Sequence, residues 1–357
     1  MGLLLWQCFA DSFDAGPGRG RRHGGSDILK SEHSREGVNM NLVKPDAVDR
    51  VAILGAGTIG ASWAAHFLAH GLSVNVWDPA PGFEARCCDF IAAAWPALIR
   101  LGAPAEMDES RMAFFGDPSE ALRNCQFVQE SGPENAEIKI ELYSRLDDVL
   151  PDNVVMASSS SGLLISELQA GRRAAARYVI GHPFNPPHLV PLVEVVGGED
   201  TDAAAIEWAL AFYNGCGKKA IRINREVPGH LANRLQAAMW REAVHLVDSG
   251  VASVEDVDIA VSYGPGLRWA LMGPNLILHL AGGDGGVRHA IEHFGPALES
   301  WWADLGCEPK ISDAAAEKVI AGVTAEAAGR SLDDLTRERD HLLISLLEML
   351  ARERGKS

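Results

Sequence analysis

Residues 51–78 carry the pattern of a complete strand–helix–strand unit with a glycine-rich first turn. The apolar run Val51–Leu54 leads directly into the motif GAGTIG at residues 55–60. Apolar side chains at helical spacing follow it and stop at Gly71, and a second apolar run ends in Asp78. Glycines so placed let the backbone approach a pyrophosphate, whose charge the helix N-terminus favours. The unit therefore predicts a dinucleotide-binding site.

Asp78 indicates which dinucleotide this site takes. A carboxylate at the end of the second strand accepts hydrogen bonds from ribose hydroxyls and repels a 2′-phosphate, so we expect NAD rather than NADP. A strand-to-helix turn without a ligand is the alternative, which the completeness of the unit disfavours. The candidate cofactor-binding residues of this unit are Gly55, Gly57, Thr58, Ile59, Gly60 and Asp78.

Further apolar runs alternate with helical patterns along the first two thirds of the chain. They lie at 125–128, 154–157 and 177–180, and the alternation predicts an α/β fold with a Rossmann-type, doubly wound parallel sheet. From residue 228 onward the period is helical, including a capping-box pattern at 253–256. We expect an NAD-binding domain at 48–227 and an all-α C-terminal domain at 228–357.

Residues 1–47 differ from the rest of the chain, since they are rich in glycine, serine and charge. Such a segment has little to bury, and we expect a flexible N-terminal extension. Met40 is an alternative start of the natural chain.

Charge and composition disfavour several classes of partner. Lys plus Arg number 32 against 48 Asp plus Glu, and the formal charge of −16 repels nucleic acid and anionic membranes. No run of about 18 apolar residues occurs, so we expect no segment that spans a bilayer. The 6 cysteines are scattered without the paired spacing of a zinc site, which indicates a reducing cytoplasm and no metal.

His182 and Glu194 form the strongest candidate for chemistry. A proline-rich turn separates two apolar segments, so the chain can fold back and bring imidazole and carboxylate together. Such a pair suits alcohol oxidation, because imidazole accepts the hydroxyl proton while the carboxylate orients it and stabilises the imidazolium. A buried structural histidine with a solvated glutamate is the alternative. His188 is a rival base that the pattern pairs with no acid.

Five blocks of sequence resemble the L-3-hydroxyacyl-CoA dehydrogenase superfamily, from about residue 50 to about residue 275. The blocks are VAILGAGTIG with Asp78, QESGPENAEIK, MASSSSGL, GHPFNPPHLVPLVEVV and EVPGHLANR. The resemblance implies that His182 is the catalytic base, Glu194 its partner, and Ser161 and Asn233 the groups that hold the substrate oxygen. It also implies that Ser131, Glu134 and Lys139 meet the nicotinamide side of the cofactor. A C-terminal helical domain that binds substrate and forms a homodimer is likewise implied.

The substrate is indicated by two further features. Residues 83–100 contain no lysine, whereas the acyl-CoA enzymes of the superfamily place lysine there, which argues against a CoA thioester. The region from Tyr263 to Trp302, which includes YGPGLRWALMGP and AGGDGGVRHAIEHFGP, resembles instead the L-carnitine dehydrogenase branch, together with HPFNPPHLVPLVEVVGG upstream. A quaternary ammonium cannot donate a hydrogen bond and is recognised by aromatic faces, while Arg268 can pair with a carboxylate. The aromatic candidates are Phe184, Trp240, Tyr263, Trp269, Trp301 and Trp302, with core or interface packing as the alternative for each.

Three other functions stay open at this point. Two lie within the superfamily: a short-chain L-3-hydroxyacyl-CoA dehydrogenase, and an L-gulonate 3-dehydrogenase similar to lambda-crystallin. The third is a non-catalytic, NAD-binding structural protein, against which the presence of His182, Glu194, Ser161 and Asn233 argues. NAD-dependent oxidation of the 3-hydroxyl of carnitine is the leading hypothesis.

Overall fold

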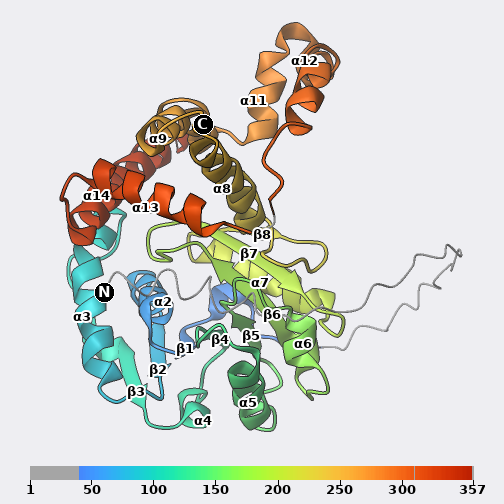
Figure 1. Ribbon diagram of the computed structural model, residues 1–357. Helices are drawn as coiled ribbons and strands as arrows, with labels where there is room; N and C mark the ends of the chain where they lie inside the picture. The colour runs from blue at the N-terminus through green and yellow to red at the C-terminus, as the bar shows by residue number, and fades with distance from the viewer. Residues whose placement is uncertain (1–39, 309, 356–357) are drawn as a thin grey trace, which may run out of the picture. The chain divides into compact units, whose positions relative to one another are not determined.

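The computed structural model describes residues 40–308 and 310–355, which form two compact units (Figure 1). The first unit ends at Leu231 and the second begins at Ala232. Each is described by itself below. The predicted flexible extension lies outside the described residues as far as residue 39.

The first unit is built on one eight-stranded sheet in the order β3-β2-β1-β4-β5-β6-β7-β8. Strands β3 to β6 of this order run parallel to their neighbours, β7 is antiparallel to β6, and β8 is parallel to β7. The strands are β1 (Arg50–Leu54), β2 (Ser73–Trp77), β3 (Met112–Phe115), β4 (Phe127–Glu130), β5 (Val155–Ser158), β6 (Tyr178–Pro183), β7 (Leu192–Gly197) and β8 (Lys219–Arg222). The predicted doubly wound parallel sheet is confirmed, and two strands of reversed direction extend it.

Helices cover both faces of this sheet, as Figure 1 shows. Val51 and Ile53 of β1 pack into one apolar cluster with α2, α3 and α7, whereas Ala52 and Leu54 pack into a second with α4, α5 and α6. Because both faces are covered, the central strands are apolar throughout rather than alternating. The helices are α2 (Thr58–Ala69), α3 (Phe83–Arg100), α4 (Pro118–Ala121), α5 (Ala136–Leu146), α6 (Ile165–Gln169) and α7 (Ala203–Gly215), with short 3₁₀ turns η1 (Pro45–Ala47), η2 (Glu109–Arg111) and η3 (Ala175–Arg177).

Residues 40–47, the last part of the predicted extension, pack against the first unit. Met40 and Leu42 lie against the cluster formed with α7, and the indole of Trp208 on α7 donates a hydrogen bond to the carbonyl oxygen of Val43. The packed fold therefore begins before residue 48, because this segment carries enough apolar side chains to bury.

The second unit is entirely helical over its described residues. Its elements are α8 (Ala232–Asp248), α9 (Val254–Tyr263), α10 (Pro265–Leu271), α11 (Pro274–Ala281), η4 (Gly283–Gly285), α12 (Gly286–Trp302), α13 (Asp313–Ala327) and α14 (Leu332–Arg354). Ser253 caps α9 by accepting a hydrogen bond from the backbone of Asp256, as the capping-box pattern predicts. Among the described helices of the whole chain, none is long and apolar enough to cross a membrane.

Candidate active site

The glycine-rich turn joins β1 to the N-terminus of α2. Gly55 has φ +98°, and a Cβ there would lie 2.7 Å from the backbone of Ser131 and Gly132. A Cβ on Gly60 would lie 1.8 Å from the carbonyl oxygen of Gly55, so helix and turn pack at backbone contact. Gly57 caps α2 without a side-chain bond, and a Cβ there would meet open space. The backbone thus leaves a cradle of open space at the N-terminus of α2, where the helix favours negative charge, and this fits a pyrophosphate.

Asp78 follows β2, next to this turn. One of its carboxylate oxygens accepts a hydrogen bond from the backbone N–H of Ala56 at 2.7 Å, and the other accepts one from Ala80 at 2.8 Å. The carboxylate is therefore held at the rim of the cradle, and its remaining lone pairs are suited to ribose hydroxyls. The geometry fits the predicted recognition of an unphosphorylated ribose.

Lys139 on α5 lies inside a buried polar cluster. Its side chain is only 1% exposed, and its ammonium donates hydrogen bonds to Glu130 at 2.6 Å and to the carbonyl oxygen of Gly132 at 3.3 Å. Glu130 also accepts hydrogen bonds from Tyr143 and Ser158. Sequence reasoning missed Glu130, although it ends β4 and its charge is what allows Lys139 to be buried. The pair holds the loop after β4 in place.

Glu134, in that loop, is bonded to the serine run that follows β5. Its Oε1 accepts hydrogen bonds from the Ser160 hydroxyl at 2.7 Å and from the backbone N–H groups of Ser161 and Gly162 at 2.9 and 2.8 Å. The hydroxyl of Ser131 lies 2.8 Å from that of Ser159. The loops after β4 and β5 therefore form one hydrogen-bonded edge at the carboxyl ends of the sheet, where ligands of such sheets bind.

His182 and Glu194 are brought together as the sequence predicts. They lie directly opposite each other in the antiparallel register of β6 and β7, and His182 Nδ1 donates a hydrogen bond to Glu194 Oε2 at 2.8 Å. Both side chains are buried. Since Nδ1 carries the proton, the neutral ring leaves its Nε2 lone pair as the basic position.

Two neighbours fix this pair. Glu194 Oε1 accepts a hydrogen bond from the backbone N–H of Leu231 at 2.9 Å, so both carboxylate oxygens are engaged. Phe184 meets the His182 ring edge to face, with ring centroids 6.0 Å apart. The rival base His188 is bonded to Ser62 on α2 instead, at 2.8 Å.

The other predicted substrate residues belong to the second unit. Asn233 is in the first turn of α8, Tyr263 ends α9, and Arg268 and Trp269 lie on α10. Tyr263 and Trp269 are exposed within that unit, as are Trp301 and Trp302 on α12. Trp240 on α8 is also exposed within that unit, and it lines a cavity of about 110 Å³ together with a cluster of valines.

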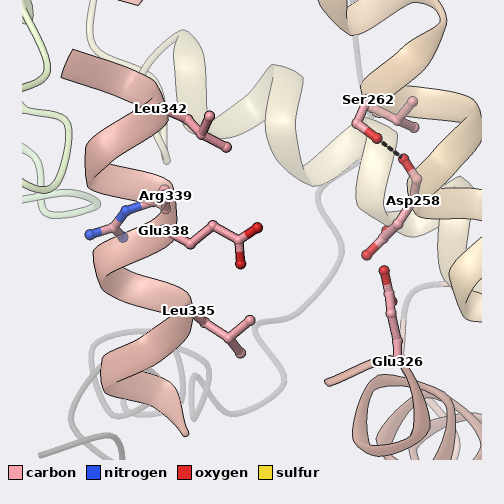
Figure 2. Close-up of a pocket in the computed structure, with 8 residues that line it drawn as sticks. Asp258, Ser262, Glu326, Leu335, Glu338, Arg339 and Leu342 are labelled. Carbon is pink, nitrogen blue, oxygen red and sulfur yellow. Dashed lines mark hydrogen bonds between the residues drawn. The ribbon is translucent and has the colours of Figure 1, made fainter. Parts of the chain in front are cut away.

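A larger cavity of about 570 Å³ also lies within the second unit, between α14 and residues of α9 and α13 (Figure 2). Leu335, Glu338 and Leu342 line it from α14, opposite Asp258 and Glu326. Burial raises the pKa of Glu326, and the negative charge of Asp258 raises it further. None of the predicted site residues lines this cavity.

The nucleotide cradle and the buried imidazole–carboxylate pair stand on one sheet, and together they give the first unit the architecture of an NAD-dependent dehydrogenase. Family models agree over both units. Residues 50–227 match the NAD-binding domain of 3-hydroxyacyl-CoA dehydrogenase, and residues 229–320 match its C-terminal domain. The chain belongs to the 3-hydroxyacyl-CoA dehydrogenase family, it is an enzyme of the NAD-dependent 3-hydroxy acid dehydrogenase class, and NAD is its cofactor.

Individual relatives narrow the position of the chain within this family. It is 48% identical to the L-carnitine dehydrogenase of Streptomyces coelicolor over 311 residues, which are 87% of this chain and 98% of that one. It is 49% identical to the L-carnitine dehydrogenase of Streptomyces griseus, over 86% of this chain and 92% of that one. The predicted resemblance to this branch is therefore confirmed.

A solved structure supports the same architecture. The NAD⁺-dependent 5-formyl-3-hydroxy-2-methylpyridine 4-carboxylic acid 5-dehydrogenase superimposes with a TM-score of 0.73 at 28% identity, over 85% of this chain and 98% of that one.

Proposed function

We propose that this protein oxidises the 3-hydroxyl of L-carnitine to 3-dehydrocarnitine with NAD, using His182 as the general base and Glu194 as its partner. The 2.8 Å hydrogen bond between these two buried side chains is the observation that carries the mechanism. The high identity to L-carnitine dehydrogenases over nearly their whole length supports the choice of substrate.

The chain's own residues supply proton transfer and orientation. His182 Nε2 takes the hydroxyl proton, while Glu194 keeps Nδ1 protonated and stabilises the positive charge that develops on the ring. NAD, when bound at the cradle after β1, supplies the acceptor for the hydride that leaves the carbinol carbon. Ser161 and Asn233 hold the substrate oxygen, and Ser131 and Glu134 meet the nicotinamide side of the cofactor. Lys139 acts there through Glu130, to which it is bonded.

The two ends of carnitine, a carboxylate and a trimethylammonium, require different kinds of side chain to bind them. We assign the carboxylate to Arg268 and the trimethylammonium to the aromatic side chains Phe184, Tyr263 and Trp269. The absence of lysine from α3 supports a small hydroxy acid over an acyl-CoA. A short-chain hydroxyacyl-CoA is the second candidate, because the family models that match this chain describe 3-hydroxyacyl-CoA dehydrogenase. A sugar acid such as gulonate is a further alternative within the superfamily.

A comparison of substrates tests this choice. Formation of NADH by the full chain is measured with L-carnitine, L-gulonate, 3-hydroxybutyryl-CoA and 4-amino-3-hydroxybutyrate, which lacks the N-methyl groups. We expect kcat/KM to be at least about tenfold higher for L-carnitine than for the amino analogue, because the desolvated quaternary cation gains about 2 kcal/mol from aromatic faces. A higher kcat/KM for gulonate or for the CoA thioester would make that compound the substrate in place of carnitine, and no turnover with any of the four would refute all of these assignments.

Replacing Asp78 by alanine tests the cofactor assignment. The variant removes both the ribose acceptor and the charge that disfavours a 2′-phosphate, so we expect weaker NAD binding and a preference for NAD over NADP reduced about tenfold or more. The ratio of kcat/KM for the two cofactors is the measurement. Asp108, an exposed aspartate outside the cradle, is the matched control, and an unchanged ratio in Asp78→Ala would remove Asp78 from the ribose site.

We further propose that the protein is a homodimer and that it is located in the cytoplasm. Leu235 and Met239 on α8 are exposed within the second unit, as are Leu342 and Met349 on α14, and such surfaces favour association of a second copy through the helical domain. The five described cysteines, which exclude Cys8, are all free thiols, and this supports a reducing compartment.

A further inference from the structure

His230 is a buried histidine of the first unit that the function above leaves without a role. It lies between β8 and α8, its side chain is 2% exposed, and its φ of +49° is a left-handed conformation that few residues other than glycine adopt. Its Nε2 is 3.0 Å from the carbonyl oxygen of Ser160. Strained backbone held by its surroundings is characteristic of functional sites.

The bond to Ser160 fixes the tautomer of this ring. Burial lowers the pKa of His230, and the neighbouring His182 lowers it further, so the ring is neutral at pH 7. A carbonyl oxygen only accepts hydrogen bonds, so the proton of the neutral ring is on Nε2 and Nδ1 is a lone-pair acceptor. Nδ1 is buried and has no hydrogen-bond partner among the described residues. Buried polar atoms are normally hydrogen-bonded, so this unpaired acceptor needs an explanation.

In the proposed reaction the neighbouring His182 takes a proton on Nε2, so its ring gains a second N–H donor during turnover. The two imidazole rings are 5.1 Å apart between centroids, tilted by 46°. The next residue, Leu231, donates its backbone N–H to Glu194, so the same turn contacts both members of the His–Glu pair. The charges that act on His230 come from His182, Glu194 and Glu134.

We propose that His230 is a positioning residue, which ties the serine run to the His182–Glu194 pair and presents its Nδ1 lone pair to His182 when that ring becomes protonated. The inference rests on the proposed role of His182 as the base. The proton moves from the substrate hydroxyl to His182 Nε2, and His230 keeps its own proton on Nε2 throughout. An uncharged acceptor beside the new imidazolium stabilises it and makes His182 a stronger base in the transition state.

Two substitutions test the roles of the two ring nitrogens of His230 separately. His230→Asn places an amide near the position of Nδ1 and tolerates a positive φ, but it is too short to reach Ser160. His230→Gln places its amide near Nε2, where it can still donate to Ser160, and offers no acceptor in the place of Nδ1. The measurements are kcat and KM for L-carnitine across pH, with NAD binding and thermal melting to establish that each variant is folded.

We expect His230→Gln to lose about tenfold in kcat with little change in KM, and the acid limb of its kcat profile to move about one pH unit lower. His230→Asn should keep kcat within about threefold of the wild type and leave the acid limb in place. If His230 had only a structural role, kcat should fall more in His230→Asn than in His230→Gln, because Gln preserves the bond to Ser160. Equal kcat values in the two variants would overturn the proposal, and so would an acid limb that does not move in His230→Gln.

His66→Gln is the matched control, since His66 is also buried and its Nε2 is bonded to a backbone carbonyl, that of Cys216. We expect its pH profile to match that of the wild type. Failure of the proposed function looks different: the wild type then leaves carnitine unoxidised, or turnover survives removal of the His182 imidazole. If both of those results support His182 and the Asn and Gln variants still behave alike, only the role of His230 is wrong.

Discussion

Replacing His182 by alanine should lower kcat for L-carnitine by about 100-fold or more while NAD binding stays within a few-fold of the wild type. In the proposed mechanism this substitution removes the Nε2 acceptor of the hydroxyl proton, and a positioned base contributes about 10² to 10⁴ in rate. The nucleotide cradle is built by the turn after β1 and is not bonded to this ring. Steady-state kinetics and titration of the full chain with NAD measure the two effects separately.

His188→Ala is the matched control for this experiment, because His188 is the rival base of the same loop. Its ring is bonded to Ser62 and packs edge to face on Phe90, so its loss removes an anchor of the loop and no proton acceptor of the reaction. We expect a modest change in KM and a kcat within a few-fold of the wild type. Turnover that survives in His182→Ala but falls in His188→Ala would move the base to His188.

The nucleotide cradle could be predicted because all of its information is local. Gly55, Gly60 and Asp78 lie within one strand–helix–strand unit. The two glycines allow close backbone contacts, and Asp78 accepts a hydrogen bond from the backbone of the same turn, so each residue type indicates its local role. The contact between His182 and Glu194 was predictable for a similar reason. They are twelve residues apart across a proline-rich turn, and in an antiparallel pair of strands such residues become direct partners.

Contacts between distant segments could not be predicted in this way. The bond of His230 to Ser160 joins residues 70 positions apart, and the residue types do not reveal it. Of the four serines at 158–161, the sequence does not distinguish which hydroxyl is bonded to Glu134, whereas in the structure that of Ser160 is the nearer. Strand β8 is short and only partly buried, so it leaves no strong apolar pattern.

The aromatic residues of the helical unit illustrate a second limit. Trp240 and Trp301 look alike in the sequence and both are exposed within their unit, yet Trp240 also lines a cavity with a cluster of valines. The sequence shows that aromatic residues are abundant in the region that resembles the L-carnitine dehydrogenase branch. Which of them meets a ligand depends on surfaces that residue types alone do not specify.

Glu194→Gln should lower kcat by about 10² to 10⁴ while the sheet stays folded. Both carboxylate oxygens of Glu194 accept hydrogen bonds, one from His182 and one from Leu231, and the side chain is fully buried. An amide has one acceptor and one donor end, so it cannot satisfy both. If its NH₂ group faces His182, the ring takes the opposite tautomer and its Nε2 carries the proton, which removes the base.

If the amide turns the other way, the Leu231 N–H loses its acceptor, and a buried unsatisfied donor costs about 1 to 3 kcal/mol of folding free energy. In either orientation the negative charge that stabilises the imidazolium in the proposed mechanism is lost, so we expect kcat to fall whichever rotamer is adopted. Kinetics with L-carnitine and chemical denaturation of the same variant separate the two costs. Glu199→Gln, an exposed glutamate just beyond the same strand, should change neither. A Glu194→Gln variant that is less stable but retains most of its kcat would make Glu194 a structural residue and leave His182 to act alone.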